Sequence, residues 1–103
     1  MADSDVLADV TDAPARDRYE ARLARPGHDP ELVGVLAYQD APDGARVLLH
    51  TVVGEEHGGH GIGAALAAHA VADARRRGVR VVPVCTFVQG WLARHPEHAD
   101  TVG

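Results

Sequence analysis

The chain has little of several residue types, and each shortage narrows the classes of protein to which it can belong. Cys85 is the only cysteine, so no internal disulfide forms and a cytoplasmic location is favoured. All 10 basic residues are arginine, which excludes Schiff-base chemistry on a lysine side chain. No apolar run approaches the roughly 20 residues that cross a bilayer, and the acidic N-terminus does not resemble a signal peptide. We therefore expect a cytoplasmic protein without a membrane partner.

Length and net charge limit the chain further. Its 103 residues suffice for one domain with a modest core, which we place at residues 16–103. Residues 1–15 are acidic and alanine-rich without a sustained period, so we expect a flexible N-terminal arm there. The net charge of -5 argues against nucleic acid as the main partner. We expect the domain to be a monomer or a homodimer.

The most informative segment is the glycine cluster between an apolar run at 47–53 and an alanine-rich segment that begins at Ile62. Its glycines are Gly58, Gly59, Gly61 and Gly63. A strand that passes through glycines into a helix presents free backbone N–H groups at the positive end of the helix dipole, and such groups bind phosphate. The alternative is a glycine-rich loop that only turns the chain. More glycines are present than a turn requires, so the phosphate loop is favoured.

Hydrophobic patterning predicts the elements around this loop. Strands are expected at 18–23, 32–38 and 45–53, and the short connections between them make these strands antiparallel neighbours. A helix is expected from Ile62 to Arg77, with its basic last turn followed by Gly78. A fourth strand at 79–85 would lie parallel to the third, and a second helix is expected at 87–95. The fold class is therefore α+β, with a mixed, mainly antiparallel sheet.

The glycine segment does not fully match either of two known nucleotide-binding motifs. Residues 59–64 fit the dinucleotide pattern G-x-G-x-x-A, but the next strand ends in Cys85-Thr86 without the acidic residue that holds a ribose. No Gly-Lys-Ser/Thr sequence is present, which excludes a Walker loop. A carrier with a pyrophosphate, such as coenzyme A, suits a short α+β chain better.

Several short motifs together resemble those of the GCN5-related N-acetyltransferase (GNAT) superfamily, in its short single-domain branch. The superfamily motif Q/R-x-x-G-x-G/A falls on residues 58–63. His50-Thr51 precedes the loop, Val-Val-Pro-x-Cys covers residues 81–85, and Arg-His-Pro-Glu covers residues 94–97. The motifs occur in order over about two-thirds of the chain. The resemblance implies a splayed parallel strand pair in the sheet, with helices flanking it.

The resemblance also implies acetyl-CoA as cosubstrate. No metal is expected, because the spread of His57, His60, Cys85, His95 and His98 over several elements does not match compact zinc spacings. The residues expected to bind acetyl-CoA, mainly through their backbone, are Thr51, Val52, Val53, Gly58, Gly59, His60, Gly61, Ile62 and Gly63. The implied activity is transfer of the acetyl group to a primary amine of a small molecule or peptide by direct attack. The alternative is a CoA- or acyl-CoA-binding module with little turnover.

Candidates for the chemistry are His50, Cys85 and Thr86. His50 is a residue type that suits a general base at neutral pH, although it also fits a core histidine. Cys85 fits an acyl acceptor, an acid or a small buried hydrophobe, and Thr86 is a weaker donor. The chain departs from its relatives in having Gly58 at the first motif position and Val52 after His-Thr. It also lacks the tyrosine acid that usually follows the fourth strand.

Overall fold

The computed structural model describes residues 8–55 and 61–103. In these ranges a single five-stranded sheet has the order β1-β2-β3-β4-β5. The strands are β1 (Asp9–Ala13), β2 (Arg18–Arg25), β3 (His28–Asp40), β4 (Arg46–Val53) and β5 (Val81–Pro83). Neighbours from β1 to β4 are antiparallel, while β5 is parallel to β4. The predicted α+β class with a mixed, mainly antiparallel sheet is confirmed.

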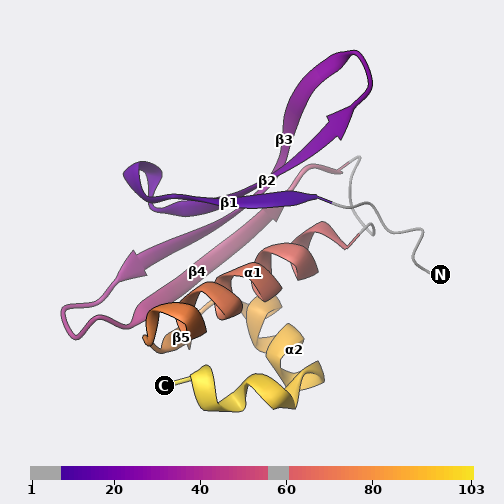
Figure 1. Cartoon of the computed structure of the whole chain (residues 1–103). Helices are drawn as coiled ribbons and strands as arrows, with labels where there is room; N and C mark the ends of the chain where they lie inside the picture. Colours follow the sequence, from indigo (N-terminus) through magenta and orange to yellow (C-terminus); the bar gives the residue numbers. More distant parts are fainter. Residues whose placement is uncertain (1–7, 56–60) are drawn as a thin grey trace.

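Two helices lie on the same face of the sheet (Figure 1). They are α1 (Ile62–Arg77) and α2 (Thr86–Arg94), and 3-10 turns occupy Pro14–Arg16 and Pro96–Thr101. The bounds of α1 agree with the prediction, because its apolar spacing and its terminal Gly78 are both clear signals. The N–H of Gly78, which has a φ of 72°, donates to the carbonyls of Ala74 and Arg75.

The core fills the space between this face of the sheet and the helices. Tyr19, Leu36 and Leu48 from three neighbouring strands are fully buried there, together with Leu66 of α1. A Cβ atom on Gly34 of β3 would lie 3.0 Å from the Ile62 side chain, so glycine at this position lets α1 approach the sheet closely. We call this side the helix face, and the opposite side of the sheet the open face.

The prediction of a flexible arm over residues 1–15 is wrong for residues 9–13, which form β1 and pair with β2. Val10 packs against the core, and Asp12 lies opposite the buried Tyr19. An aspartate directed at the helix face breaks the apolar alternation that normally indicates a strand. This is why the pattern did not show β1.

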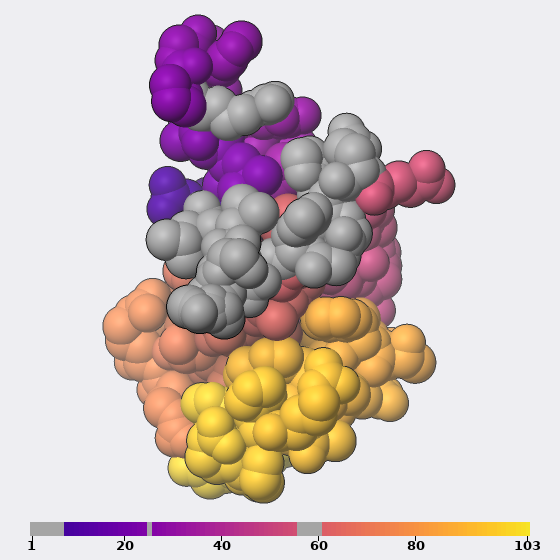
Figure 2. All heavy atoms as spheres, turned by 90° about the vertical axis from the view of Figure 1, so that its right-hand side faces the viewer, coloured from indigo at the N-terminus to yellow at the C-terminus, as the bar shows by residue number. Residues whose placement is uncertain are grey.

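Two other strands differ from their predicted lengths. β3 begins at His28 rather than Leu32, so it is longer than predicted and forms a long hairpin with β2. That hairpin projects from the molecule at the top of Figure 2. β5 has only three residues, because the Val79 N–H closes the end of α1 on the Ala74 carbonyl and Cys85 is the residue that precedes α2. None of the described helices is a candidate for spanning a membrane.

Candidate functional site

The parallel pairing between β4 and β5 covers only the first part of β4. Arg46, Val47 and Leu48 pair with Val81, Val82 and Pro83. The Leu48 carbonyl then accepts hydrogen bonds from the N–H groups of Val84 (3.0 Å) and Cys85 (2.9 Å). The chain turns away into α2 at this point, so residues 49–53 of β4 extend beyond β5. This geometry agrees with the splayed strand pair that the sequence predicts.

A β-bulge sets the direction of the backbone along this part of β4. Leu49 is the extra residue, since Leu48 pairs with Tyr38 and His50 pairs with Ala37. Beyond the bulge the Gly54 N–H donates 3.0 Å to the Val33 carbonyl. Because backbone groups of an antiparallel strand alternate in direction, Thr51 and Val53 direct their N–H and C=O groups away from β3. These groups face the side where β5 has ended.

The glycine segment is described only in part. Gly58, Gly59 and His60 lie outside the described residues. Gly61 precedes α1 with a φ of 79°, and its conformation is the left-handed one that glycine adopts without strain. In the described chain no side chain caps the first turn of α1 through Gly61. Uncapped N–H groups at the start of a helix are suited to bind an anion.

Gly63 has a packing role that the sequence did not indicate. A Cβ atom at Gly63 would lie 2.8 Å from the ring of Phe87. The first turn of α1 therefore packs closely on the first turn of α2, and Phe87 itself is 42% exposed. Both helices begin in this region, so the positive ends of two helix dipoles meet beside the free part of β4.

The three catalytic candidates do not lie on one side of the sheet. His50 is exposed and pairs with Ala37, whose neighbour Leu36 faces the core, so His50 lies on the open face. Cys85 is 7% exposed and lies on the helix face beside Thr51. Thr86 is the exposed first residue of α2. The structure thus brings Cys85 to Thr51 and leaves His50 across the strand from both.

The contact between Thr51 and Cys85 joins a residue expected to bind the cofactor to a candidate catalytic residue. The Thr51 hydroxyl oxygen lies 3.3 Å from the Cys85 sulfur, within hydrogen-bonding distance. The sequence predicted a role for the Thr51 backbone only. The bulge at Leu49 turns the Thr51 side chain to the helix face, where it meets the residue before α2.

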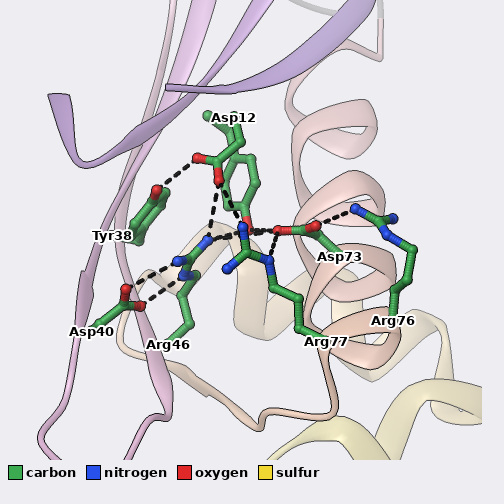
Figure 3. A network of polar contacts seen from close by, with 8 residues as sticks. Asp12, Tyr38, Asp40, Arg46, Asp73, Arg76 and Arg77 are labelled. Carbon is green, nitrogen blue, oxygen red and sulfur yellow. Dashed lines mark hydrogen bonds and ion pairs between the residues drawn. The ribbon is translucent and has the colours of Figure 1, made fainter. Parts of the chain in front are cut away.

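A buried polar network, which the sequence analysis missed, anchors α1 to the sheet (Figure 3). Arg46 of β4 is 5% exposed and makes a bidentate contact with Asp40, at 2.7 and 3.0 Å. It also donates to the Tyr19 hydroxyl (2.9 Å), which in turn donates to Asp73 of α1 (2.8 Å). The Arg46 guanidinium lies 3.8 Å from the centre of the Tyr38 ring. The network holds β2, β3, β4 and α1 in one arrangement.

Burial and hydrogen bonding change the acidity of the groups in this network. Burial raises the pKa of both Tyr19 and Tyr38, and a hydrogen bond to Asp12 further raises that of Tyr38. Hydrogen bonds from Arg46 lower the pKa of Asp40. Because a raised pKa makes a phenol a weaker acid, neither tyrosine is suited to protonate a leaving group at neutral pH.

The arginines in the last turn of α1 belong to ion pairs rather than to a free basic patch. Arg76 and Arg77 both pair with Asp73, and Arg77 also contacts Asp12 (3.4 Å). Arg75 pairs with Asp100 in the C-terminal turn at 2.6 Å. Each arginine of the run thus has a carboxylate partner, and the pairs with Asp12 and Asp100 tie the end of α1 to β1 and to the C-terminal turn.

The C-terminal histidines also have structural contacts. His95 Nδ1 lies 2.8 Å from the Trp91 carbonyl, and the two rings stack with centroids 4.2 Å apart. These contacts brace the end of α2. Within residues 8–55 and 61–103, no group of three or more histidine, cysteine, aspartate or glutamate side chains is arranged to hold a metal ion.

Comparison with known families agrees with this geometry. Residues 18–101 match the family described as GCN5-related N-acetyl-transferase. The chain belongs to this family. The match begins at β2 and ends in the last turn, so it includes the free part of β4 and the first turns of both helices. No curated protein matches the chain significantly. Membership of this family supports acyl transfer as the general class of activity.

Proposed function

We propose that this GNAT-family domain transfers the acetyl group of acetyl-CoA to a primary amine of a small molecule or peptide by direct attack. The observation that carries the proposal is the free part of β4 beside two helix N-termini. Thr51 and Val53 direct backbone groups to this edge, and the amides of a pantetheine arm are suited to pair with them as an added strand. The N-terminus of α1, with Gly61 before it, suits the pyrophosphate.

Different residues of the chain then carry out the separate steps of the reaction. His50 takes the proton from the attacking ammonium, and a backbone N–H of β4 stabilises the oxyanion of the tetrahedral intermediate. When the C–S bond breaks, the thiolate takes a proton from Cys85, from Thr86 or from water. Because the amine attacks the thioester directly, no acyl group needs to be attached to the protein.

The second candidate function is a CoA- or acyl-CoA-binding module with little turnover. It is favoured by Val52, which is 56% exposed at the position where relatives carry a candidate acidic base. It is also favoured by the position of His50, which lies on the other face of the sheet from Cys85. The two functions share the cofactor site and differ only in catalysis.

Calorimetry with acetyl-CoA and CoA, followed by measurement of free-thiol release with a panel of amines, separates these functions. Binding with thiol release supports the transferase, while tight binding without release supports the module. If neither ligand binds, both functions are rejected. A His50→Ala variant should bind CoA normally but lose turnover and alter the pH–rate profile, whereas His28→Ala, on the exposed hairpin, should change neither.

A paired glycine substitution tests the binding site itself. Gly61→Glu should abolish CoA binding, because it places bulk and negative charge before α1. Gly44→Glu is the matched control, since Gly44 also has a positive φ (91°, against 79° for Gly61) and lies in the turn between β3 and β4. Both substitutions place a side chain at a residue with positive φ, which strains the backbone. Normal CoA affinity in Gly61→Glu would reject the site.

A further inference from the structure

The open face of the sheet carries polar and charged residues that the proposed chemistry does not use. Both helices cover the other face (Figure 1), which leaves the open face uncovered by the described helices. One row of register partners across this face consists of Thr11, Glu20, Val35 and Val52. The row ends on β4 at Val52, which is two residues along the strand from His50.

Glu20 is a buried carboxylate on this face. It is 3% exposed because the arginines around it cover it. Arg16 and Arg18 contact its Oε2 atom at 3.0 and 2.8 Å, and Arg22 contacts Oε1 at 2.9 Å. We call Arg16, Arg18 and Arg22 together with Glu20 the arginine cluster. Burial raises the pKa of Glu20, but the hydrogen bonds from Arg18, Arg16 and Arg22 outweigh it and lower the value to about 2.

The arginine cluster has more positive charge than Glu20 needs. One arginine can hold a carboxylate through two parallel hydrogen bonds, and three are present. Asp9 lies opposite Arg22 in the register. The side chains of Arg18 and Arg22 are 30% and 35% exposed, and that of Arg16 is 62% exposed. Each guanidinium has five N–H donors, so donors remain for a further anion.

A shallow pocket of about 210 Å³ is lined mainly by residues of β3 and β4, among them Leu32, which is the register partner of Arg22, and the acidic residue Glu31. Its lining includes Val35, which pairs with Glu20, and Val52, which pairs with Val35. Leu32, 42% exposed, adds a further apolar side chain. Since neighbouring strands are about 4.8 Å apart, Glu20 on β2 and Val52 on β4 are separated by roughly 10 Å. Across the open face, the N–H donors of the arginine cluster are therefore followed by an apolar surface and then by the edge of β4.

We propose that the open face binds the acceptor, and that the acceptor is an amine which also carries a carboxylate about 10 Å from its nitrogen. The carboxylate binds the arginine cluster, the linking atoms cross Val35 and Val52, and the amine reaches β4 beside His50. This inference rests on the proposed function, because it assigns the amine side of the same reaction. Charge favours a carboxylate as the end group that binds here, because the arginines would repel a cationic end.

The binding test uses ω-aminooctanoate and, as the matched probe without a carboxylate, octylamine. Without CoA present, ω-aminooctanoate should shift the amide signals of residues 18–22, 35 and 52 in nuclear magnetic resonance spectra of the whole chain. It should bind about tenfold or more tightly than octylamine, because a charge-assisted hydrogen bond increases affinity by about this factor. Equal affinity of the two amines, or shifts confined to other strands, would overturn the proposal.

A double variant tests the arginines directly. Arg16→Ala with Arg22→Ala leaves Arg18 to pair with Glu20, so the buried carboxylate keeps one partner. The preference for ω-aminooctanoate should disappear in this variant. The control is Arg75→Ala with Arg80→Ala, which removes two exposed arginines that pair with Asp100 and Asp43 and changes the net charge equally. A preference that survives the first variant, or that is lost in the control as well, contradicts the proposal.

Steady-state kinetics separates failure of this inference from failure of the proposed function. If acetyl-CoA binds and thiol is released equally well with both amines, the transferase stands and the acceptor assignment is wrong. If ω-aminooctanoate is preferred, its advantage should lie in KM and should disappear in the double variant, with unchanged calorimetric affinity for CoA. If CoA does not bind, the proposed function is rejected. The amide shifts are measured without CoA, so they report on the acceptor surface independently of that result.

Discussion

The Thr51 hydroxyl lies 3.3 Å from the Cys85 sulfur, and this contact joins the free part of β4 to the first turn of α2. Cys85 is therefore held beside the edge where we place the cosubstrate. Its 7% exposure keeps the sulfur largely covered by protein atoms. The contact makes Cys85 the residue whose substitution best distinguishes direct transfer from transfer through an acyl-protein.

We predict that Cys85→Ser keeps turnover within about tenfold of the unmodified protein, because a hydroxyl still donates a hydrogen bond and direct attack needs no thiol nucleophile. Intact-mass measurement after mixing with acetyl-CoA should show no acetyl group on the protein. A loss of several orders of magnitude, together with an acetylated Cys85 in the unmodified chain, would establish an acyl-cysteine intermediate instead.

Gly63→Ala should destabilise the fold by about 1–3 kcal/mol, because the added methyl group overlaps the Phe87 ring. The Cβ atom would lie 2.8 Å from that ring. Gly90→Ala in α2 is the control, since its nearest atom outside the local helix backbone is the end of the Arg94 side chain at 3.7 Å. It should stabilise the protein by about 0.5–1 kcal/mol. Urea unfolding measures both, and equal effects would reject the close approach of the two helices.

Arg46→Met should lower the free energy of unfolding by about 1–3 kcal/mol, because it removes the hydrogen bonds that the buried guanidinium donates to Tyr19 and Asp40. Arg80→Met is the comparison, since Arg80 forms an exposed pair with Asp43 at 2.8 Å. That substitution should cost about 0–1 kcal/mol. Denaturant titrations of the two variants decide the point, and a small loss for Arg46→Met would show that the network adds little to stability.

Stability should depend on pH through Glu20. Its folded pKa is lowered from 4.5 to about 2, so the ion pairs of the arginine cluster stabilise the fold above pH 4.5. This contribution is lost as the pH falls from 4.5 to about 2. We expect the stability difference between the unmodified chain and Glu20→Gln to shrink over that interval. A difference that stays constant with pH would contradict the assignment.

The elements with strong patterns could be predicted from the sequence. The spacing of Ile62, Leu66 and Ala70, with Gly78 after the last turn, fixed the bounds of α1, and all three apolar residues are buried. β1 could not be found in the same way, because Asp12 faces the helices and is held by Tyr38 at 2.6 Å. A charged residue in the core has no signal in a hydrophobic pattern until its partner is known.

The candidate site was predictable in its position but not in its geometry. Strict alternation from the buried Leu48 places His50 on the helix face, next to Cys85. The extra residue at Leu49 shifts the alternation by one, so Thr51 takes that place and His50 faces the other way. A one-residue bulge leaves no distinct signal in a single sequence, although it decides which side chains meet.

The arginine cluster was hidden for a related reason. Arg18 and Arg22 alternate with apolar residues in β2, which is the usual pattern of a solvated strand face. Glu20 is buried only because arginines on both sides of it in the sequence fold over it. Such burial depends on side-chain conformation, which the pattern of residue types does not specify.

β1 is the outer strand of the described sheet, and its short length and acidic residues affect how molecules meet one another. An outer strand exposes backbone groups that can pair with a strand from another molecule, which is the first step toward fibrils. β1 has five residues with the sequence DVTDA, and Asp9 at its exposed end repels a second copy of the same strand. A short outer strand with a charged residue at its exposed end is therefore poorly suited to join edge to edge with a second molecule in a concentrated solution.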